Sequence, residues 1–205
     1  YLSTLNDSEL SDFLRVADIH HVSVRALQVV ADAADTLGHP QLARWCESAL
    51  TTERARIERA IGFLERICQA LEAGGCNVSV IKSLDHWPDL GSDLDLYTSG
   101  DEHTVARVMT EEFNAEREPR SWGDRLANKW NFSIPGLPEL VEIHVQYLGQ
   151  TGEHLDLARR VERCRLAHRP AALLGRPKVV NRLPVVLRVP EAAALVERAL
   201  RGALR

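Results

Sequence analysis

The chain has 205 residues, of which 45% are apolar and 26% are charged, and this is enough for one large domain or two small ones with a hydrophobic core. The formal net charge of −4 argues against a nonspecific nucleic-acid-binding protein, because such proteins carry an excess of Lys and Arg. The sequence shows no run of about 18 apolar residues and no basic-then-apolar segment at its start, so we expect a cytoplasmic protein without a membrane span.

The N-terminal part of the chain predicts helices. Asn6 offers an N-cap oxygen to a helix that begins near Asp7, and apolar residues follow at helical spacing. A second helix is expected over residues 20–37, and Pro40 suits the first turn of a third. The clearest apolar stripe runs over residues 52–73 and ends at two glycines.

From residue 78 onward the pattern changes to short apolar strands around one helix. The expected strands cover residues 78–81, 92–97, 128–134 and 139–147. The helix is expected over residues 102–116. The last two strands flank Pro135-Gly136-Leu137-Pro138, which predicts a β-hairpin with a four-residue connection.

These elements predict an α+β protein in three parts. Residues 1–53 form an N-terminal helical segment, and residues 54–150 form an α+β domain with a small mixed sheet. Residues 151–205 form a C-terminal extension of helices and short strands, with an arginine-rich helix at its start.

Three acidic residues form the candidate site. Asp93 and Asp95 lie two residues apart on one expected strand, so their side chains share a face of the sheet. Two carboxylates this close repel each other, which favours a divalent cation between them. Glu142 lies on the second hairpin strand, with His144 on the same face, and it reaches the same pocket if that strand lies beside the first.

The order of these residues resembles the DNA-polymerase-β-type nucleotidyltransferase superfamily, and within it the bacterial uncharacterised nucleotidyltransferase family. Ile81-Lys82-Ser83 ends an apolar strand, nine residues follow, and then comes Asp93-Leu94-Asp95-Leu96. A later strand carries Glu142-Ile143-His144. The likeness covers about residues 54–148. It implies a polymerase-β-like nucleotidyltransferase fold, with a small mixed sheet and helices, preceded by the N-terminal helical segment.

The resemblance also implies a reaction and assigns roles to residues. It implies Mg²⁺-dependent transfer of a nucleoside monophosphate from an NTP to a hydroxyl of a small molecule or a protein, with Mn²⁺ as an alternative ion. The metal-binding and catalytic residues would be Asp93, Asp95 and Glu142. The nucleotide-binding residues would be Lys82, Ser83, Gly91, Ser92 and Lys129. The residues on the acceptor side would be His144 and Arg125.

Lys82 stands where the family has Gly, and this difference leaves two interpretations open. The lysine supplies a charge for phosphate, or nucleotide binding has been modified or lost. The alternative function is therefore a catalytically weakened nucleotidyltransferase-fold protein that serves as a nucleotide-binding or regulatory partner module. The identity of the NTP, the hydroxyl acceptor and the oligomeric state stay open.

Simpler interpretations exist for the same residues. In these interpretations, Asp93 and Asp95 lie at a solvated strand end and have no metal-binding role. Glu142 lies on an exposed face of the hairpin, and His144 is a packed histidine. Glycosyltransferases and haloacid-dehalogenase-type phosphatases also carry Asp-x-Asp. The first class places the motif after alternating strands and helices and the second near the chain start, and this chain fits neither pattern. The four cysteines are dispersed without metal-binding spacing and predict reduced, mostly buried thiols.

Overall fold

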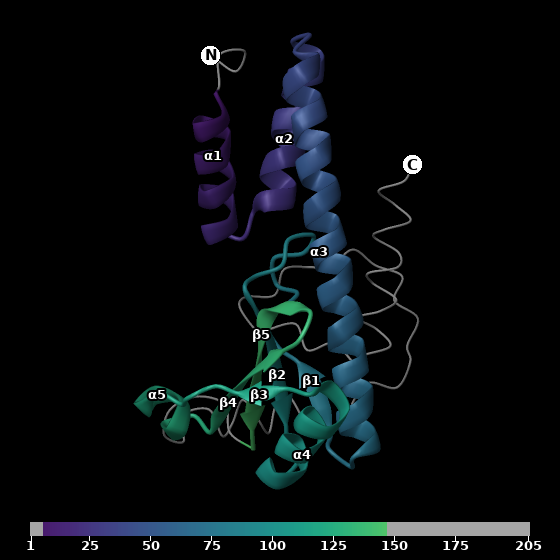
Figure 1. Ribbon diagram of the computed structural model, residues 1–205, viewed down its shortest axis with the longest axis vertical. Helices are drawn as coiled ribbons and strands as arrows, with labels where there is room; N and C mark the ends of the chain where they lie inside the picture. The colour runs from purple at the N-terminus through teal and green to yellow at the C-terminus, as the bar shows by residue number, and fades with distance from the viewer. Residues whose placement is uncertain (1–5, 147–205) are drawn as a thin grey trace, which may run out of the picture. The chain divides into compact units, whose positions relative to one another are not determined.

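The computed structural model of the protein describes residues 6–146 (Figure 1). Two compact units share these residues. The first runs to Gly62 and also contains His86–Gly91, and the second contains Phe63–Asp85 and the chain from Ser92 onward. The predicted C-terminal extension, residues 151–205, lies outside the described residues.

The first unit is helical. It contains α1 (Asp7–Ile19), α2 (Ser23–Thr36) and the first part of α3 (Pro40–Ala73). Asn6 caps α1, since its side chain accepts hydrogen bonds from the main-chain N–H groups of Ser8 and Glu9, and Glu9 bonds back to the N–H of Asn6.

Helix α3 is longer than the sequence pattern predicts. A third helix beginning at Pro40 and a separate stripe over residues 52–73 were expected, whereas the structure has one continuous helix of 34 residues. No glycine or proline stands between residues 41 and 61, so nothing in the sequence interrupts the helical hydrogen bonds there.

The segment His86–Gly91 is fixed within the first unit by polar contacts. Asp89 is 1% exposed, and its carboxylate accepts hydrogen bonds from the main-chain N–H of Val24 and, at 2.6 Å, from Nε of Arg25. Arg56 of α3 donates from Nη2 to the carbonyl oxygen of Leu90 at 3.0 Å. The Asp89 carboxylate therefore acts as the cap of α2, whose own N-cap residue makes no side-chain hydrogen bond.

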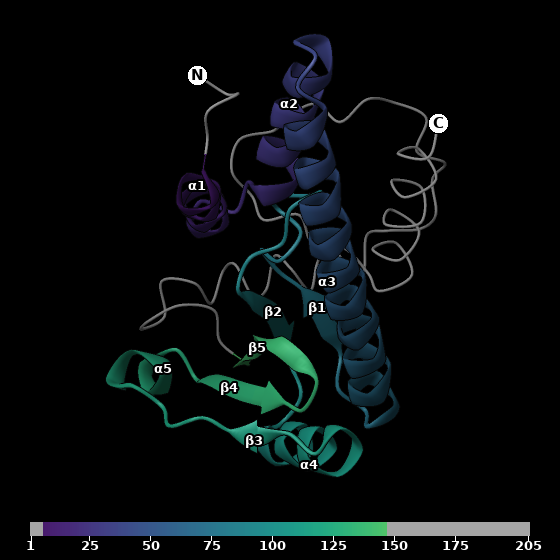
Figure 2. The same ribbon diagram turned by 45° about the horizontal axis from the view of Figure 1, so that its top comes forward.

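The second unit is built on a five-stranded sheet with the strand order β1-β2-β5-β4-β3 (Figure 2). The strands are β1 (Val78–Val80), β2 (Asp93–Thr98), β3 (Glu116–Arg117), β4 (Lys129–Ile134) and β5 (Leu137–Val145). The β2–β5 pair is parallel and the other pairs are antiparallel. Helices α4 (Glu102–Phe113) and α5 (Trp122–Leu126) complete the unit. The predicted α+β class with a small mixed sheet is thus confirmed.

Alternation along the strands separates a core face of the sheet from the face that carries the acidic residues. Seven residues of the core face are 0% exposed: Leu94, Leu96, Thr98, Phe132, Val141, Ile143 and Val145. Gly74, which directly follows α3, lies close to α4, because a Cβ placed on it would lie only 3.0 Å from Cγ2 of Val108. The opposite face of β2 and β5 carries Asp95, Glu142 and His144.

The hairpin differs in one respect from the sequence prediction. Its connection has two residues rather than four, because Ile134 already pairs with Leu137 and β5 begins there. Pro135 fixes its own backbone angle and Gly136 adopts a positive φ of 83°, which only glycine takes without strain. Leu137 is 6% exposed, so its burial favours the strand over the turn.

Two short elements, β3 and α5, were not expected from the sequence. Both are too short to show a hydrophobic period. Among the described residues, no helix has the length and apolar character needed to cross a membrane.

Candidate functional site

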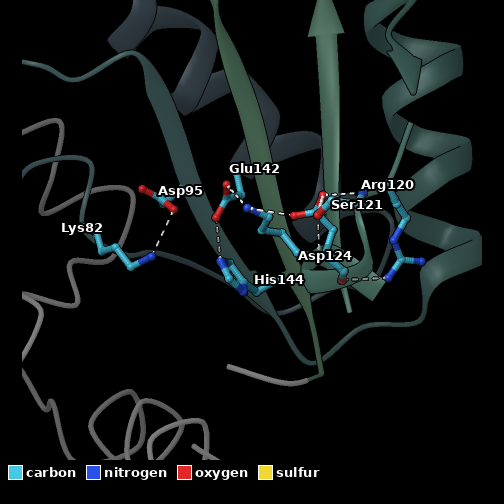
Figure 3. A network of polar contacts seen from close by, with 8 residues as sticks. Lys82, Asp95, Arg120, Ser121, Asp124, Glu142 and His144 are labelled. Carbon is cyan, nitrogen blue, oxygen red and sulfur yellow. Dashed lines mark hydrogen bonds and ion pairs between the residues drawn. The ribbon is translucent and has the colours of Figure 1, made fainter. Parts of the chain in front are cut away.

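The site lies where β2 and β5 run side by side. The two strands are parallel, with Asp95 opposite Glu142 and Tyr97 opposite His144. Side chains of directly paired residues point to the same face of a sheet, so the Asp95 and Glu142 carboxyls face the same side. Figure 3 shows these two side chains with their polar neighbours. The structure therefore provides the strand adjacency on which the predicted cluster depends.

Both carboxylate oxygens of Glu142 already have a partner. Lys129 donates from Nζ to Oε2 at 2.7 Å, and Nε2 of His144 lies 2.9 Å from Oε1 (Figure 3). The side chains of Glu142 and Lys129 are 12% and 23% exposed, so water screens their ion pair only in part. Lys129 reaches Glu142 from the adjacent strand β4.

Asp95 is more buried and has a weaker cationic partner. The residue is 6% exposed, and Nζ of Lys82 lies 3.5 Å from its Oδ1. Burial raises the pKa of the Asp95 carboxyl to about 7. The charge of Lys82 opposes this rise, and the negative charges of Glu142 and Asp93 add to it.

Glu142 shows the opposite behaviour. Burial alone would raise its pKa, but hydrogen bonds from His144 and Lys129 outweigh that effect and lower the pKa to about 2. The two neighbouring carboxyls therefore have widely separated pKa values. Such a separation is typical of clustered carboxyls in functional sites.

The turn after β1 approaches Asp95 through Ser83. The Ser83 hydroxyl oxygen accepts a hydrogen bond of 2.7 Å from the main-chain N–H of Asp95. The N–H of Ser83 donates to the carbonyl oxygen of Ile81 at 2.6 Å. Lys82, between them, has a φ of 59°, in the left-handed region that favours glycine. The lysine thus adopts the backbone conformation that glycine would take most easily at this position.

Asp124 extends the polar network to α5 and was not among the site residues predicted from the sequence. Its Oδ1 lies 3.0 Å from Nζ of Lys129. Its Oδ2 accepts hydrogen bonds from the N–H and the hydroxyl of Ser121 at 2.8 and 2.6 Å (Figure 3). Asp124 therefore completes the capping box of α5, whose N-cap residue is Ser121, and also binds Lys129. The available sequence signal was Ser121-x-x-Asp124, which has the spacing of a capping box.

The structure does not bring all the predicted residues into one cluster. Asp93 shares the face of Asp95 but pairs with Leu140, one position away from Glu142 on that face of β5. Ser92 is exposed, and its carbonyl oxygen accepts a hydrogen bond from the N–H of Leu140 at 3.3 Å. Of the other predicted residues, Arg125 is exposed on α5, and Gly91 belongs to the first unit.

The converging groups offer a donor set for a divalent cation. Asp95, Glu142 and His144 each present one ligand atom, and these atoms all lie within 4.8 Å of one another. Lysine ammonium groups lie against both carboxylates. A divalent cation bound to these atoms would therefore compete with the two ammonium groups for the carboxylate oxygens.

Comparisons with models of protein families, with curated proteins and with solved structures found no match for this chain.

Proposed function

We propose that the protein is a metal-dependent nucleotidyltransferase that moves a nucleoside monophosphate from an NTP to a hydroxyl group of a small molecule or a protein. The main support is the pairing of Asp95 with Glu142 on neighbouring parallel strands, with lysines against both carboxylates. The order of the acidic residues in the sequence, which resembles the polymerase-β-type superfamily, supports the same proposal.

The proposed reaction forms one phosphorus–oxygen bond and breaks another. The acceptor hydroxyl oxygen attacks the α-phosphorus of the NTP, the bond from that phosphorus to the bridging oxygen breaks, and pyrophosphate leaves. The hydroxyl proton passes to a carboxylate of the cluster. Bound divalent ions supply neutralisation of the charge that grows on the phosphate oxygens.

The residues of the cluster and its surroundings would have different roles in the proposed reaction. Asp95 and Glu142 would hold the ion, with Asp93 as a further carboxylate on the same face. The ammonium groups of Lys82 and Lys129 would attract the triphosphate, since each lies within 3.5 Å of a cluster carboxylate. Ser83 would hold the β1–β2 turn against Asp95 through its 2.7 Å hydrogen bond.

The experiment measures pyrophosphate release from each of the four NTPs with Mg²⁺ or Mn²⁺, together with a thermal shift for each mixture. We expect one NTP to stabilise the protein, by about 2.7 kcal/mol at a hundred times its dissociation constant. Asp95→Asn should abolish release while the protein stays folded. Glu116→Gln, which changes an exposed carboxylate on β3, is the control and should release pyrophosphate as the wild type does.

A second candidate function is a nucleotide-binding module without turnover. The observation that favours it is the engagement of both Glu142 oxygens by Lys129 and His144. In that case an NTP would raise the melting temperature in a manner that depends on Asp95, and no pyrophosphate would appear with any acceptor. An absence of NTP stabilisation would contradict both candidates.

A further inference from the structure

We propose that His144 is a direct ligand of the divalent ion, beside Asp95 and Glu142, and that the site therefore favours a first-row transition ion such as Mn²⁺ over Mg²⁺. This inference rests on the proposed function, because that function places a divalent ion in the cluster.

The convergence of the three side chains is the first argument. Their ligand atoms all lie within 4.8 Å of one another. Two ligand atoms that are each about 2.1 Å from one ion lie about 3 Å apart when they are adjacent and about 4.2 Å apart when they are opposite. Each separation in the cluster thus has to shorten by less than about 2 Å, which torsions of the two side chains can supply together. Asp93, on the same face of β2, is not in this group of three.

The surroundings of the His144 ring are the second argument. His144 is 6% exposed, and its ring points toward Glu142, with Nε2 2.9 Å from Oε1 (Figure 3). Nδ1 is buried and has no hydrogen-bond partner among the residues that the structure describes. Nε2 is thus the ring nitrogen that faces the carboxylate cluster, whereas Nδ1 lies on the other side of the ring. When Nδ1 carries the ring proton, the lone pair of Nε2 is directed at the cluster.

The distance between Nε2 of His144 and Glu142 is the third argument. If Nε2 lacked a proton, its lone pair would face the Glu142 oxygen at 2.9 Å, and two acceptors at that distance repel each other. A cation bound to both atoms would remove this repulsion, and two atoms 2.9 Å apart are spaced as adjacent ligands of one ion.

The chemistry of the donor set then decides which ions bind well. Mg²⁺ prefers oxygen ligands and keeps several waters, whereas imidazole nitrogen suits transition ions. A site of two carboxylates and one imidazole is thus better matched to Mn²⁺ than to Mg²⁺. We expect Mn²⁺ to bind about tenfold tighter than Mg²⁺, and His144→Gln to weaken Mn²⁺ binding about 10–100-fold.

The test is electron spin-echo spectroscopy of Mn²⁺ bound to the full chain, which detects a nitrogen atom bonded to the ion. Calorimetric titration with Mn²⁺ and with Mg²⁺ accompanies it. The variants are His144→Gln, Asp95→Asn and, as a control for surface histidines, His103→Gln, which changes an exposed residue of α4. A thermal melt of each variant checks that it is folded.

The expected result is nitrogen modulation in the wild type and in His103→Gln, and its loss in His144→Gln. Mn²⁺ that binds in an Asp95-dependent manner without nitrogen modulation would overturn the inference and leave the proposed function standing. Nitrogen modulation that persists in His144→Gln would also overturn it. An absence of Asp95-dependent binding of either ion would remove both the inference and the proposed function. The wild-type spectrum decides even if His144→Gln fails to fold, because a bound ion without a nitrogen neighbour already contradicts the inference.

Discussion

The hydroxyl oxygen of Ser83 accepts a hydrogen bond of 2.7 Å from the main-chain N–H of Asp95. Ser83 stands in the turn after β1 and Asp95 in the middle of β2, and both residues are less than 10% exposed, at 7% and 6%. This bond fixes the turn that carries Lys82 to the strand that carries the most buried carboxylate of the cluster.

Ser83→Ala should therefore destabilise the protein. It leaves the buried N–H of Asp95 without its partner, which costs about 1–3 kcal/mol. Urea denaturation gives the free energy of unfolding. Ser92→Ala, at an exposed hydroxyl nearby in the chain, should change that free energy by less than about 0.5 kcal/mol. Equal stability of the two variants would contradict the structural role of Ser83.

Two replacements of Lys82 distinguish the effect of its backbone conformation on stability from the effect of its charge. Lys82→Ala and Lys82→Gly remove the same ammonium group, but only glycine takes the φ of 59° without strain. Lys82→Gly should thus be more stable than Lys82→Ala by about 1 kcal/mol. The comparison uses chemical denaturation of both variants. If Lys82→Ala were as stable as Lys82→Gly, this result would contradict the left-handed conformation at residue 82.

Lys129→Met should destabilise the ion-free protein and increase its response to a metal ion. Glu142 and Asp124, each 12% exposed in its side chain, would both lose the ammonium group, at a cost of about 1.5–3 kcal/mol. A divalent ion replaces the missing positive charge. Millimolar Mn²⁺ should therefore raise the melting temperature of Lys129→Met more than that of the wild type.

The matched control for that variant is Arg125→Met, which removes an exposed cation from α5. Its stability should stay within about 0.5 kcal/mol of the wild type, and its response to Mn²⁺ should not change. The same response to Mn²⁺ in all three proteins would show that Lys129 and the ion do not share Glu142.

The stability of the ion-free protein should depend on pH through Asp95. The pKa of this carboxyl rises from 3.8 to about 7 in the folded protein, so the folded state holds the proton more tightly than the unfolded state. The free energy of unfolding should therefore fall as the pH rises from about 4 to about 7. Glu142 has a lowered pKa, and its contribution is lost only below its unfolded value of 4.5, as the pH falls toward 2.

Asp95→Asn removes the group responsible and provides the test. Urea denaturation between about pH 5 and pH 8, without metal, should show the variant gaining stability relative to the wild type as the pH rises. Parallel pH profiles for the two proteins would contradict the raised pKa of Asp95.

The sequence predicts which acidic side chains share a face of a strand but not which strands are neighbours. Alternation along a strand predicts that Glu142 and His144 share a face, because side chains alternate with a period of two. It carries no information about which strands are neighbours. The parallel pairing of β2 with β5 is a long-range contact, and only the structure shows that Asp95 stands opposite Glu142.

Long-range contacts also explain two differences between the predicted and the observed structure. The hairpin connection was expected to contain Leu137, because two prolines bracket the segment, but burial of Leu137 extends the strand. Asp124 was missed because its importance comes from Lys129, which lies on a strand that follows α5. A capping residue that also anchors a lysine cannot be recognised without the position of that lysine.

The placement of Asp89 determines how this protein can be shortened. In the chain, His86–Gly91 connects β1 to β2, yet it belongs to the compact unit of the first helices, where Asp89 binds Val24 and Arg25. A fragment that begins at Phe63 would keep every strand of the sheet and leave this buried aspartate without either partner. Biochemical work on the carboxylate cluster should therefore retain α2, since removing the N-terminal helices would also release the connection between the first two strands.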